Sequence, residues 1–417
     1  MTTTAPTKAR ATPQQWVRSN LFRTPLDAVV SVVAAIGGGY VIYRFLRFVF
    51  VTGRWEIVRR NLALFIVGAY DRDELWRPAL SLIVLAGLVG VFAGVVRRRQ
   101  VEAGTSDPTL TMGQRVVDLL KRLWPAVLGV GLMLSLTETI TPTLIFIAAV
   151  VAAVVGRLIG VRLPTAALGP LIAAAFVIGV AMVWLLAQPL GWDDWGGLML
   201  NLFLAGISIT LCFPLGVLLA LGRRSKLPLI RAVSTTYIEV FRGVPLIALL
   251  LMANVALGFF VPETIDVFGL FEVDLVPGKV VRAIVVFTLF TAAYVAEIVR
   301  GGLQSVPKGQ IEAGQAQGMS PFSVTTYIVL PQALRNVIPA LVGQFISLFK
   351  DTTLAGAAMG FLELLSAAQA VTKQPDFSGQ GLIAETLVFV TFVFWVGSFT
   401  MSRESQRLEG KLGVGSR

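Results

Sequence analysis

Long runs of hydrophobic residues, separated by short polar stretches, dominate this chain of 417 residues. Eight runs are long enough to approach the roughly 30 Å hydrocarbon core of a bilayer. They lie near residues 27–51, 78–96, 142–160, 166–190, 198–221, 244–261, 280–298 and 382–401. Two shorter runs, 124–136 and 336–349, are also counted, because without them the charge pattern places several loops on the wrong side of the membrane. The pattern predicts an all-α, polytopic integral membrane protein with about ten transmembrane helices, or eight without the shorter runs.

Composition and charge narrow the possible functions. Hydrophobic residues make up 55% of the chain and charged residues 14%, which leaves no soluble domain of any size. The net charge of +11 comes from basic residues between the apolar runs, where membrane orientation requires them, so we do not expect a nucleic-acid partner. The chain has no histidine and one cysteine, Cys212, within an apolar run. We therefore expect no His/Cys metal site and no disulfide framework.

The distribution of lysine and arginine predicts that both termini are cytoplasmic. Basic residues precede the first run and follow the second and the 198–221 run, namely Lys8, Arg10, Arg18, Arg23, Arg97, Arg98, Arg99, Arg223, Arg224 and Lys226. The loops on the opposite side carry Asp193, Asp194, Glu263, Asp266, Glu272 and Asp274. Residues 52–77 depart from this rule, since they hold five arginines on the expected outer side, nearly balanced by four acidic residues.

A polar segment from Gly309 to Pro331 interrupts the apolar runs. Good helix formers precede Gly318, which can adopt the left-handed conformation that ends a helix. Ser320 and Pro321 then suit a new helix start, and Pro331 disfavours continuation. The segment therefore predicts two short helices joined at a tight corner. An amphipathic helix on the membrane surface is the alternative, but small residues and amides fit a protein groove better than a lipid surface.

Charged residues in or beside the membrane need an explanation, because each costs several kcal/mol there. Glu239 and Arg242 are three residues apart on an expected helix that enters the membrane at Val244 and Pro245, and they can pair. Glu297 and Arg300 have the same spacing. We favour structural ion pairs over direct substrate contact for both.

Lys350, Asp351 and Thr352 follow an apolar stretch, at a point where a helix can break. Adjacent helical residues do not face each other, so Lys350 and Asp351 are expected to have different partners. One partner can be the carboxylate or amino group of an amino acid, which would place these residues on a translocation path; a purely structural role is the alternative.

The second half of the chain resembles the polar amino acid family of ABC transporter permeases. Its cytoplasmic coupling loop is matched by Glu312, Ala313, Gly314, Gly318, Ile328, Leu330 and Pro331, with Gly314 standing where alanine is usual. Further matching strings are PLGVLLALGRRS, IEVFRGVPLI, AYVAEIVRGGLQSVPKGQ, LPQALRNVIPA and FKDTTL. Together with the long N-terminal extension, they are similar to the larger permease subunit of general L-amino acid importers.

The resemblance implies a type I ABC importer transmembrane domain in the C-terminal half of the chain, in a bacterial inner membrane. We expect an N-terminal membrane extension at 1–197, with a periplasmic segment near 52–77, and a permease core at 198–417, with the coupling loop near 299–335. Expected partners are two copies of an ABC ATPase subunit, a second permease subunit, a periplasmic amino-acid-binding protein and an L-amino acid substrate.

ATP hydrolysis is expected on the separate ATPase, because the chain has no GxxxxGK[ST] nucleotide loop. We expect no catalytic residues, no bound metal and no cofactor. The alternative is an ion-coupled secondary transporter, which would usually show inverted repeats or paired broken helices and would not need a docking loop.

Overall fold

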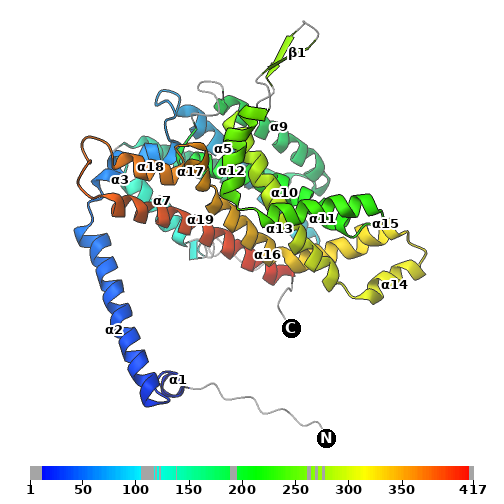
Figure 1. Cartoon of the computed structure of the whole chain (residues 1–417), viewed down its shortest axis with the longest axis horizontal. Helices are drawn as coiled ribbons and strands as arrows, with labels where there is room; N and C mark the ends of the chain where they lie inside the picture. The colour runs from blue at the N-terminus through cyan, green and yellow to red at the C-terminus, as the bar shows by residue number, and fades with distance from the viewer. Residues whose placement is uncertain are drawn as a thin grey trace. The chain divides into compact units, whose positions relative to one another are not determined.

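The computed structural model describes residues 12–104, 117, 120–121, 124–137, 139–187, 195–260, 264–267, 271–274 and 278–412. Helices make up nearly all of these residues (Figure 1). The chain divides into two compact units, Met1–Trp55 and Glu56–Arg417. Five charged residues used above for orientation lie outside the described residues: Lys8, Arg10, Asp193, Asp194 and Glu263.

The first unit contains α1 (Pro13–Asn20), α2 (Pro25–Arg47) and the π-helix η1 (Phe48–Thr52). Thr24 begins α2 in a capping box: its hydroxyl accepts a hydrogen bond from the backbone N–H of Asp27, whose carboxylate accepts one from the N–H of Thr24. No residue of α2 is buried in this unit. An apolar helix without a protein partner is what lipid contact requires.

The second unit is a bundle of long and short helices with one small hairpin. Its first elements are α3 (Glu56–Arg60), α4 (Leu62–Val67), α5 (Trp76–Glu102), α7 (Trp124–Ser135), α8 (Thr141–Arg162), η2 (Thr165–Ala167) and α9 (Leu168–Ala187). The remainder are α10 (Gly197–Arg223), α11 (Pro228–Gly243), α12 (Leu246–Phe260), β1 (Thr264–Val267), β2 (Phe271–Asp274), α13 (Lys279–Ser305), α14 (Lys308–Ala316), α15 (Pro321–Ser323), the π-helix η4 (Val324–Val329), α16 (Leu330–Asp351), α17 (Leu354–Met359), α18 (Leu364–Val371) and α19 (Ile383–Leu412).

Seven described helices are long and apolar enough to cross a membrane, or eight spans if α11 and α12 count as one bent span. The eight long runs correspond to these spans, so the expected count of ten is wrong and the count of eight holds for the described residues. The run at 124–136 forms only the twelve-residue α7. The run at 336–349 lies within α16, whose first turns carry Gln332, Arg335 and Asn336 and lower its hydropathy.

The bend between α11 and α12 measures 99° and falls at Val244 and Pro245, where the sequence predicts membrane entry. A proline in a helix interior removes a hydrogen bond and clashes with the preceding turn, which explains the break. The all-α expectation has one exception. Strands β1 and β2 pair antiparallel, with Thr264 opposite Asp274, because both carry β-branched or aromatic residues at alternate positions.

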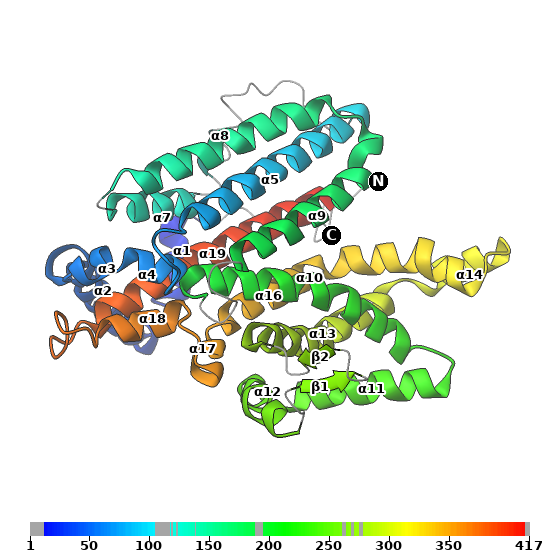
Figure 2. The same cartoon turned by 90° about the horizontal axis from the view of Figure 1, so that it is seen from above.

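Helices α5 and α8 run side by side (Figure 2) and approach each other closely along a seam of small residues. A β-carbon added to Gly156 of α8 would overlap the carbonyl oxygen of Gly87 in α5. A β-carbon added to Gly90 would likewise overlap the backbone of Ala153. Small residues bring backbones into van der Waals contact, which is a principal source of helix association in membranes.

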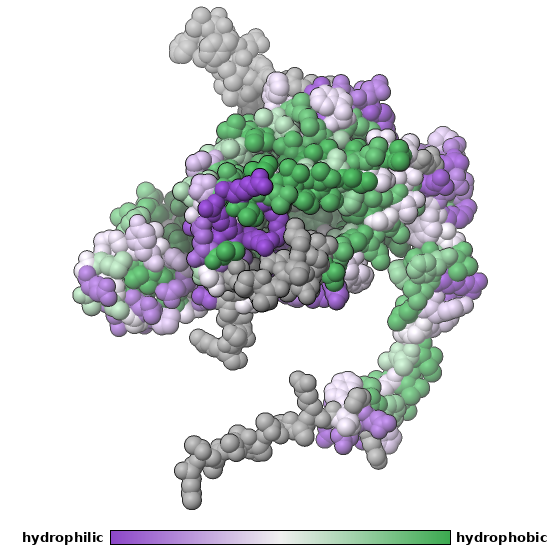
Figure 3. Space-filling model, turned by 180° about the vertical axis from the view of Figure 1, so that it is seen from behind, coloured by the Kyte–Doolittle hydropathy of each residue, from purple (hydrophilic) through white to green (hydrophobic). Residues whose placement is uncertain are grey.

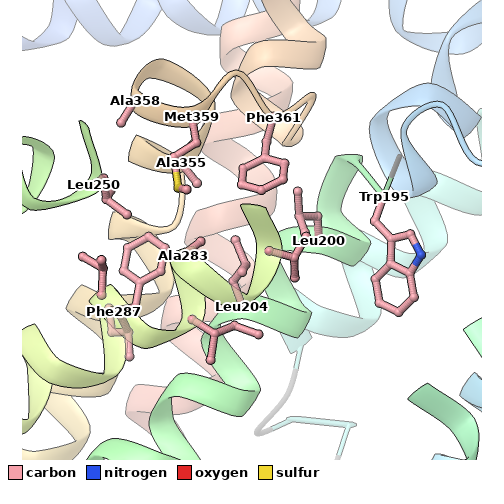
Figure 4. Packing of buried hydrophobic residues seen from close by; sticks show 14 of the residues in the cluster. Trp195, Leu200, Leu204, Leu250, Ala283, Phe287, Ala355, Ala358, Met359 and Phe361 are labelled. Atoms are coloured by element: carbon pink, nitrogen blue, oxygen red, sulfur yellow. The ribbon is translucent and has the colours of Figure 1, made fainter. Parts of the chain in front are cut away.

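The second unit has two clusters of buried side chains. The α17 cluster contains Leu200, Leu204, Phe287, Met359 and Phe361, shown in Figure 4, together with residues of α4 and α12. The loop cluster contains residues of α10, α11, α13 and α16 packed against the 306–329 segment. Outside these clusters, large hydrophobic side chains are widely exposed (Figure 3), as a lipid-facing surface requires.

Candidate coupling loop and charge network

The expected helix corner is present between α14 and α15. Gly318 has a φ of 77°, in the left-handed region that favours glycine. Around it, the N–H of Gly318 donates to the carbonyl of Gln315 at 2.9 Å, and the N–H of Met319 donates to the carbonyl of Gly314 at 3.1 Å. These bonds satisfy carbonyl groups that the end of α14 leaves without a partner.

A serine cap starts the second helix of the corner, as the sequence predicts. The Ser320 hydroxyl accepts a hydrogen bond from the N–H of Ser323 at 3.1 Å. Pro321 occupies the first helical position, where its missing N–H has no intrahelical partner. The corner is thus fixed on both sides by local sequence.

Pro331 does not end the second helix, which corrects the sequence-based expectation. Helical backbone runs without interruption from Pro321 through η4 into α16, and Pro331 lies at the beginning of α16. A proline here would clash with the carbonyl of Tyr327 in a regular α-helix. Residues 324–329 instead form a π-helix, whose wider turn changes the hydrogen-bond partners and accommodates the ring.

The loop residues identified by the resemblance divide into an exposed and a packed group. Glu312, Ala313, Gly318 and Pro331 are exposed, Ile328 and Leu330 are half-buried, and Gly314 is buried. A β-carbon on Gly314 would lie 2.9 Å from Cδ1 of Ile328. The departure from alanine at this position therefore lets α14 lie close to the π-helix.

Two exposed aromatic residues on the same loop were not singled out from the sequence. Phe322 is 76% exposed and Tyr327 is 72% exposed. Both are large hydrophobic residues within a polar segment, and that composition was the signal that could have identified them. Aromatic anchors of this kind are enriched where proteins dock.

The loop is attached to the long helices through the loop cluster. Val306, Val324 and Val329 of the loop pack with Val299 of α13 and Ala333 of α16. All five are nearly or fully buried. The loop therefore shares one closely packed interior with α13 and α16.

Five charged residues from three helices form a network near one end of the long helices. Arg223 of α10 bonds to both Glu239 of α11, at 2.9 Å, and Glu297 of α13. Arg300 binds Glu297 through two nitrogens, at 2.8 and 3.0 Å. Arg242 is 3.9 Å from Glu297, and its guanidinium lies 5.6 Å from the ring centroid of Tyr294. Glu297 is the centre of the network, with 16% of its side chain exposed.

The expected Glu297–Arg300 pair is confirmed, whereas the expected pairing of Glu239 with Arg242 is wrong. Glu239 pairs with Arg223, and Arg242 lies 3.9 Å from Glu297. The physical reason is that Glu297 is the more buried carboxylate, where attraction to several guanidinium groups is screened least. In the sequence, Arg223 indicated only the orientation of the chain in the membrane. Its ion-pair partners lie 16 and 74 residues away along the chain, so no local pattern identifies them.

The helix break expected after Lys350 is present, since α16 ends at Asp351 and α17 begins at Leu354. Thr352 is fully buried, donates to the carbonyl of Phe349 at 2.7 Å and accepts from Nδ2 of Asn201 at 3.0 Å. Among the described residues, the side chains of Lys350 and Asp351 make no ion pair or hydrogen bond with each other or with a third residue.

A fully buried carboxylate, Glu363, joins this region and was missed in the sequence. It caps α18 by accepting from the N–H groups of Leu365 and Ser366, at 2.8 and 2.7 Å. Asn201 of α10 lies beside it, and its Oδ1 accepts from the N–H of Leu364 at 3.1 Å. Asn201 thus links the end of α16 to the start of α18. Nothing local distinguishes Glu363 from an ordinary loop glutamate.

Comparisons with known proteins identify the family of the chain. The family model described as binding-protein-dependent transport system inner membrane component matches residues 212–410. A glutamate/glutamine/aspartate/asparagine transport system permease protein, BztC of Rhodobacter capsulatus, is 32% identical over 95% of this chain and 93% of its own length. The inner membrane amino-acid ABC transporter permease protein YhdY of Escherichia coli is 41% identical over 59% of this chain and 66% of its own length.

A solved amino acid ABC transporter structure covers 51% of this chain and 91% of its own, with 27% identity and a TM-score of 0.43. The similarity to BztC spans nearly all of both chains, including the N-terminal extension. The chain therefore belongs to the family of binding-protein-dependent transport system inner membrane components, and it is a multi-pass membrane permease subunit of an ABC transporter.

Proposed function

We propose that this chain is the larger permease subunit of an ATP-driven importer for L-amino acids, with a broad range that favours polar ones, in a bacterial inner membrane. The observation that carries the proposal is the exposed corner at Gly318, backed by the buried loop cluster. The corner packs against the loop cluster on one side and is exposed on the other. The exposed side suits docking of another protein that exerts a force on it. The amino acids named for BztC support polar substrates.

The proposed complex contains two ABC ATPase subunits at the coupling loops, a second permease subunit and a periplasmic binding protein that delivers the amino acid. In this arrangement both termini and the loop near 299–335 are cytoplasmic, and residues 52–77 are periplasmic. Residues 198–417 form the permease core, and residues 1–197 form a membrane extension. ATP binding closes the ATPase subunits and, through Glu312–Pro331, turns the long helices outward.

Within the core, we assign Lys350 and Asp351 to the translocation path, with Thr352 buried directly behind them. Their position at the break between α16 and α17 supports this assignment, since broken helices line substrate sites in transporters. The opposite charges of Lys350 and Asp351 suit the carboxylate and amino groups of an amino acid. Glu239, Arg242, Glu297 and Arg300 hold helices together instead.

The proposal is tested by uptake of labelled glutamate and of a neutral amino acid into vesicles that contain all the proposed subunits. We expect uptake to require ATP and to fall about tenfold or more in Gly318→Trp. A bulky side chain at the corner would weaken the binding free energy of the ATPase by about 1.4 kcal/mol or more. Gly318→Asn is the matched control, since asparagine also adopts the left-handed conformation. Normal ATP-driven uptake by both Gly318→Trp and the charge reversal Glu312→Lys would reject coupling through this loop.

The exposed aromatic residues give a second prediction about the same contact. Phe322→Ala is expected to lower the affinity for the ATPase about thirtyfold, because the lost aromatic contact contributes about 2 kcal/mol of binding free energy. Less ATPase should then co-purify with the chain. The melting temperature of the isolated chain should stay unchanged, because the side chain is mostly exposed. Gln317→Ala, an exposed neighbour at the corner, should do neither. Equal ATPase binding by both variants would exclude Phe322 from the contact.

A further inference from the structure

Residues 56–70, part of the proposed extension, are built into the permease core. They form the two short helices α3 and α4 and the turn that follows. Neither helix is long enough to span a membrane. Even so, Ile57, Val58 and Phe65 are completely buried. A segment of this length buries such side chains only by packing against other elements.

The long and short helices that α3 and α4 pack against lie in the second half of the chain, while Tyr70 also contacts Leu186 of α9. Helix α3 contacts α19, and α4 contacts α10 and α18. The rings of Phe65 and Phe389 of α19 are 5.1 Å apart between centroids. Val67 and Tyr70 belong to the α17 cluster itself. The segment is therefore a component of this cluster rather than an outer layer.

Three stretches of backbone meet at the turn after α4. Gly68 has a φ of 66°, and a β-carbon there would lie 2.7 Å from the carbonyl carbon of Gly196. Gly197 in turn donates its N–H to the carbonyl of Leu362 at 2.8 Å. The contact continues from residue 68 through the start of α10 to the loop between α17 and α18. Backbones this close to one another leave no room for side chains.

Polar contacts fix the same segment at its other end. Nε2 of Gln374, just after α18, donates to Oδ1 of Asn61 at 2.8 Å, and Nδ2 of Asn61 donates to the carbonyl of Ile57 at 3.0 Å. Arg60 is 3.8 Å from Asp376. The Tyr70 hydroxyl donates to the carbonyl of Leu186 at 3.2 Å. Burial raises the pKa of Tyr70, so the phenol stays protonated and remains a donor.

Residues 354–371, which follow the break after α16, have little stability of their own. Helices α17 and α18 contain six and eight residues, too few to persist without packing. The hydrogen bonds of Asn201 attach this segment to the end of α16, beside Lys350 and Asp351. The position of α17 and α18 therefore depends on what packs against them.

We propose that residues 56–70 act as a brace that holds α17 and α18 (residues 354–371) in place, and so positions one end of the translocation path. This inference rests on the proposed function, in which the path runs past the end of α16. Loosening the brace frees α17 and α18 to move without any signal from the coupling loop. ATP hydrolysis and amino acid movement then become partly independent. Asn61 and Gln374 are positioning residues in this scheme.

The first test measures the position of α18 without transport. In a Cys212→Ala background, which removes the chain's only cysteine, Ala367→Cys places a thiol at a fully buried position of α18. The brace is loosened by Asn61→Ala together with Gln374→Ala, so that neither amide is left buried without its partner. We expect a water-soluble maleimide to label the thiol about fivefold faster in the purified chain, which corresponds to about 1 kcal/mol of local opening.

The control pair is Ser405→Ala with Glu409→Gln, which removes one side-chain hydrogen bond of 2.8 Å within α19. It should leave the labelling rate unchanged. An unchanged rate in the Asn61→Ala, Gln374→Ala variant would overturn the brace. The result does not depend on which substrate the complex moves or on whether it moves one.

The second test measures amino acid moved per ATP hydrolysed in the complete complex. We expect this ratio to fall severalfold in the brace variant and to be retained in the control pair. A merely structural role would reduce the number of intact complexes without changing the ratio, so faster labelling with an unchanged ratio would overturn the proposal. Absence of ATP-driven uptake by the unaltered complex would instead reject the proposed function, and the labelling result would stand separately.

Discussion

Glu297→Gln is expected to reduce the stability of the protein more than the removal of any other charge in its network. Three arginines, Arg223, Arg242 and Arg300, point at this carboxylate. The neutral amide would leave them close together with only the exposed Glu239 nearby. Losing one partner of a buried ion pair costs 3–5 kcal/mol. Because the arginines are partly exposed, we expect about 2 kcal/mol here.

Thermal unfolding of the purified chain in detergent measures this effect, and the expected change is a clear fall in melting temperature. Glu239→Gln is the matched control: its carboxylate is 57% exposed and pairs with Arg223, so the cost should be below about 1 kcal/mol. The double variant Glu297→Gln, Arg300→Gln removes one positive charge as well and should regain part of the loss. If the Glu297→Gln and Glu239→Gln variants had the same melting temperature, Glu297 would not be the centre of the network.

Gly156→Leu is expected to separate α5 from α8. The new side chain would start where the carbonyl oxygen of Gly87 already lies, so the helices must move apart along their whole seam. Overpacking typically costs 1–3 kcal/mol, and the loss of close backbone packing along this membrane helix pair adds to it. We expect a fall in melting temperature of about 5 °C or more and lower accumulation in the membrane.

Gly179→Leu in α9 provides the comparison for this variant, because nothing lies within 4 Å of its β-carbon position. It makes the same chemical change in a neighbouring apolar helix and should leave the melting temperature unchanged. Equal melting of the two variants would show that the seam contributes little to stability.

Features set by nearby residues were predictable from the sequence. The eight long apolar runs, the corner at Gly318 and the cap at Ser320 depend on composition and on turn chemistry within a few positions. The all-α fold class is confirmed, and the short hairpin is a local exception where strand-forming residues alternate between two spans. Apolar runs predict the spans, and the Gly, Ser and Pro residues at helix ends predict where the short helices begin and end.

Features set by distant residues were not predictable. Arg223 lies 74 residues from Glu297, and Asn61 lies 313 residues from Gln374, so no local pattern pairs them. Glu363 looks like a loop residue until the fold buries it. Pro331 was interpreted as a stop because a π-helix ahead of a proline has no sequence signature comparable to a cap. In each case tertiary packing selected among locally acceptable alternatives.

The α17 cluster and the loop cluster share three long helices, α10, α13 and α16, each of which contributes residues to both. In the proposed coupling, a push at the loop would tilt these helices about a point between the clusters, near Phe287 and Ala292 of α13. Helix α13 has 27 residues and is about 40 Å long. A tilt of about 5° would move its two ends about 2 Å in opposite directions, so a small displacement at the loop would reach the far end of the helix.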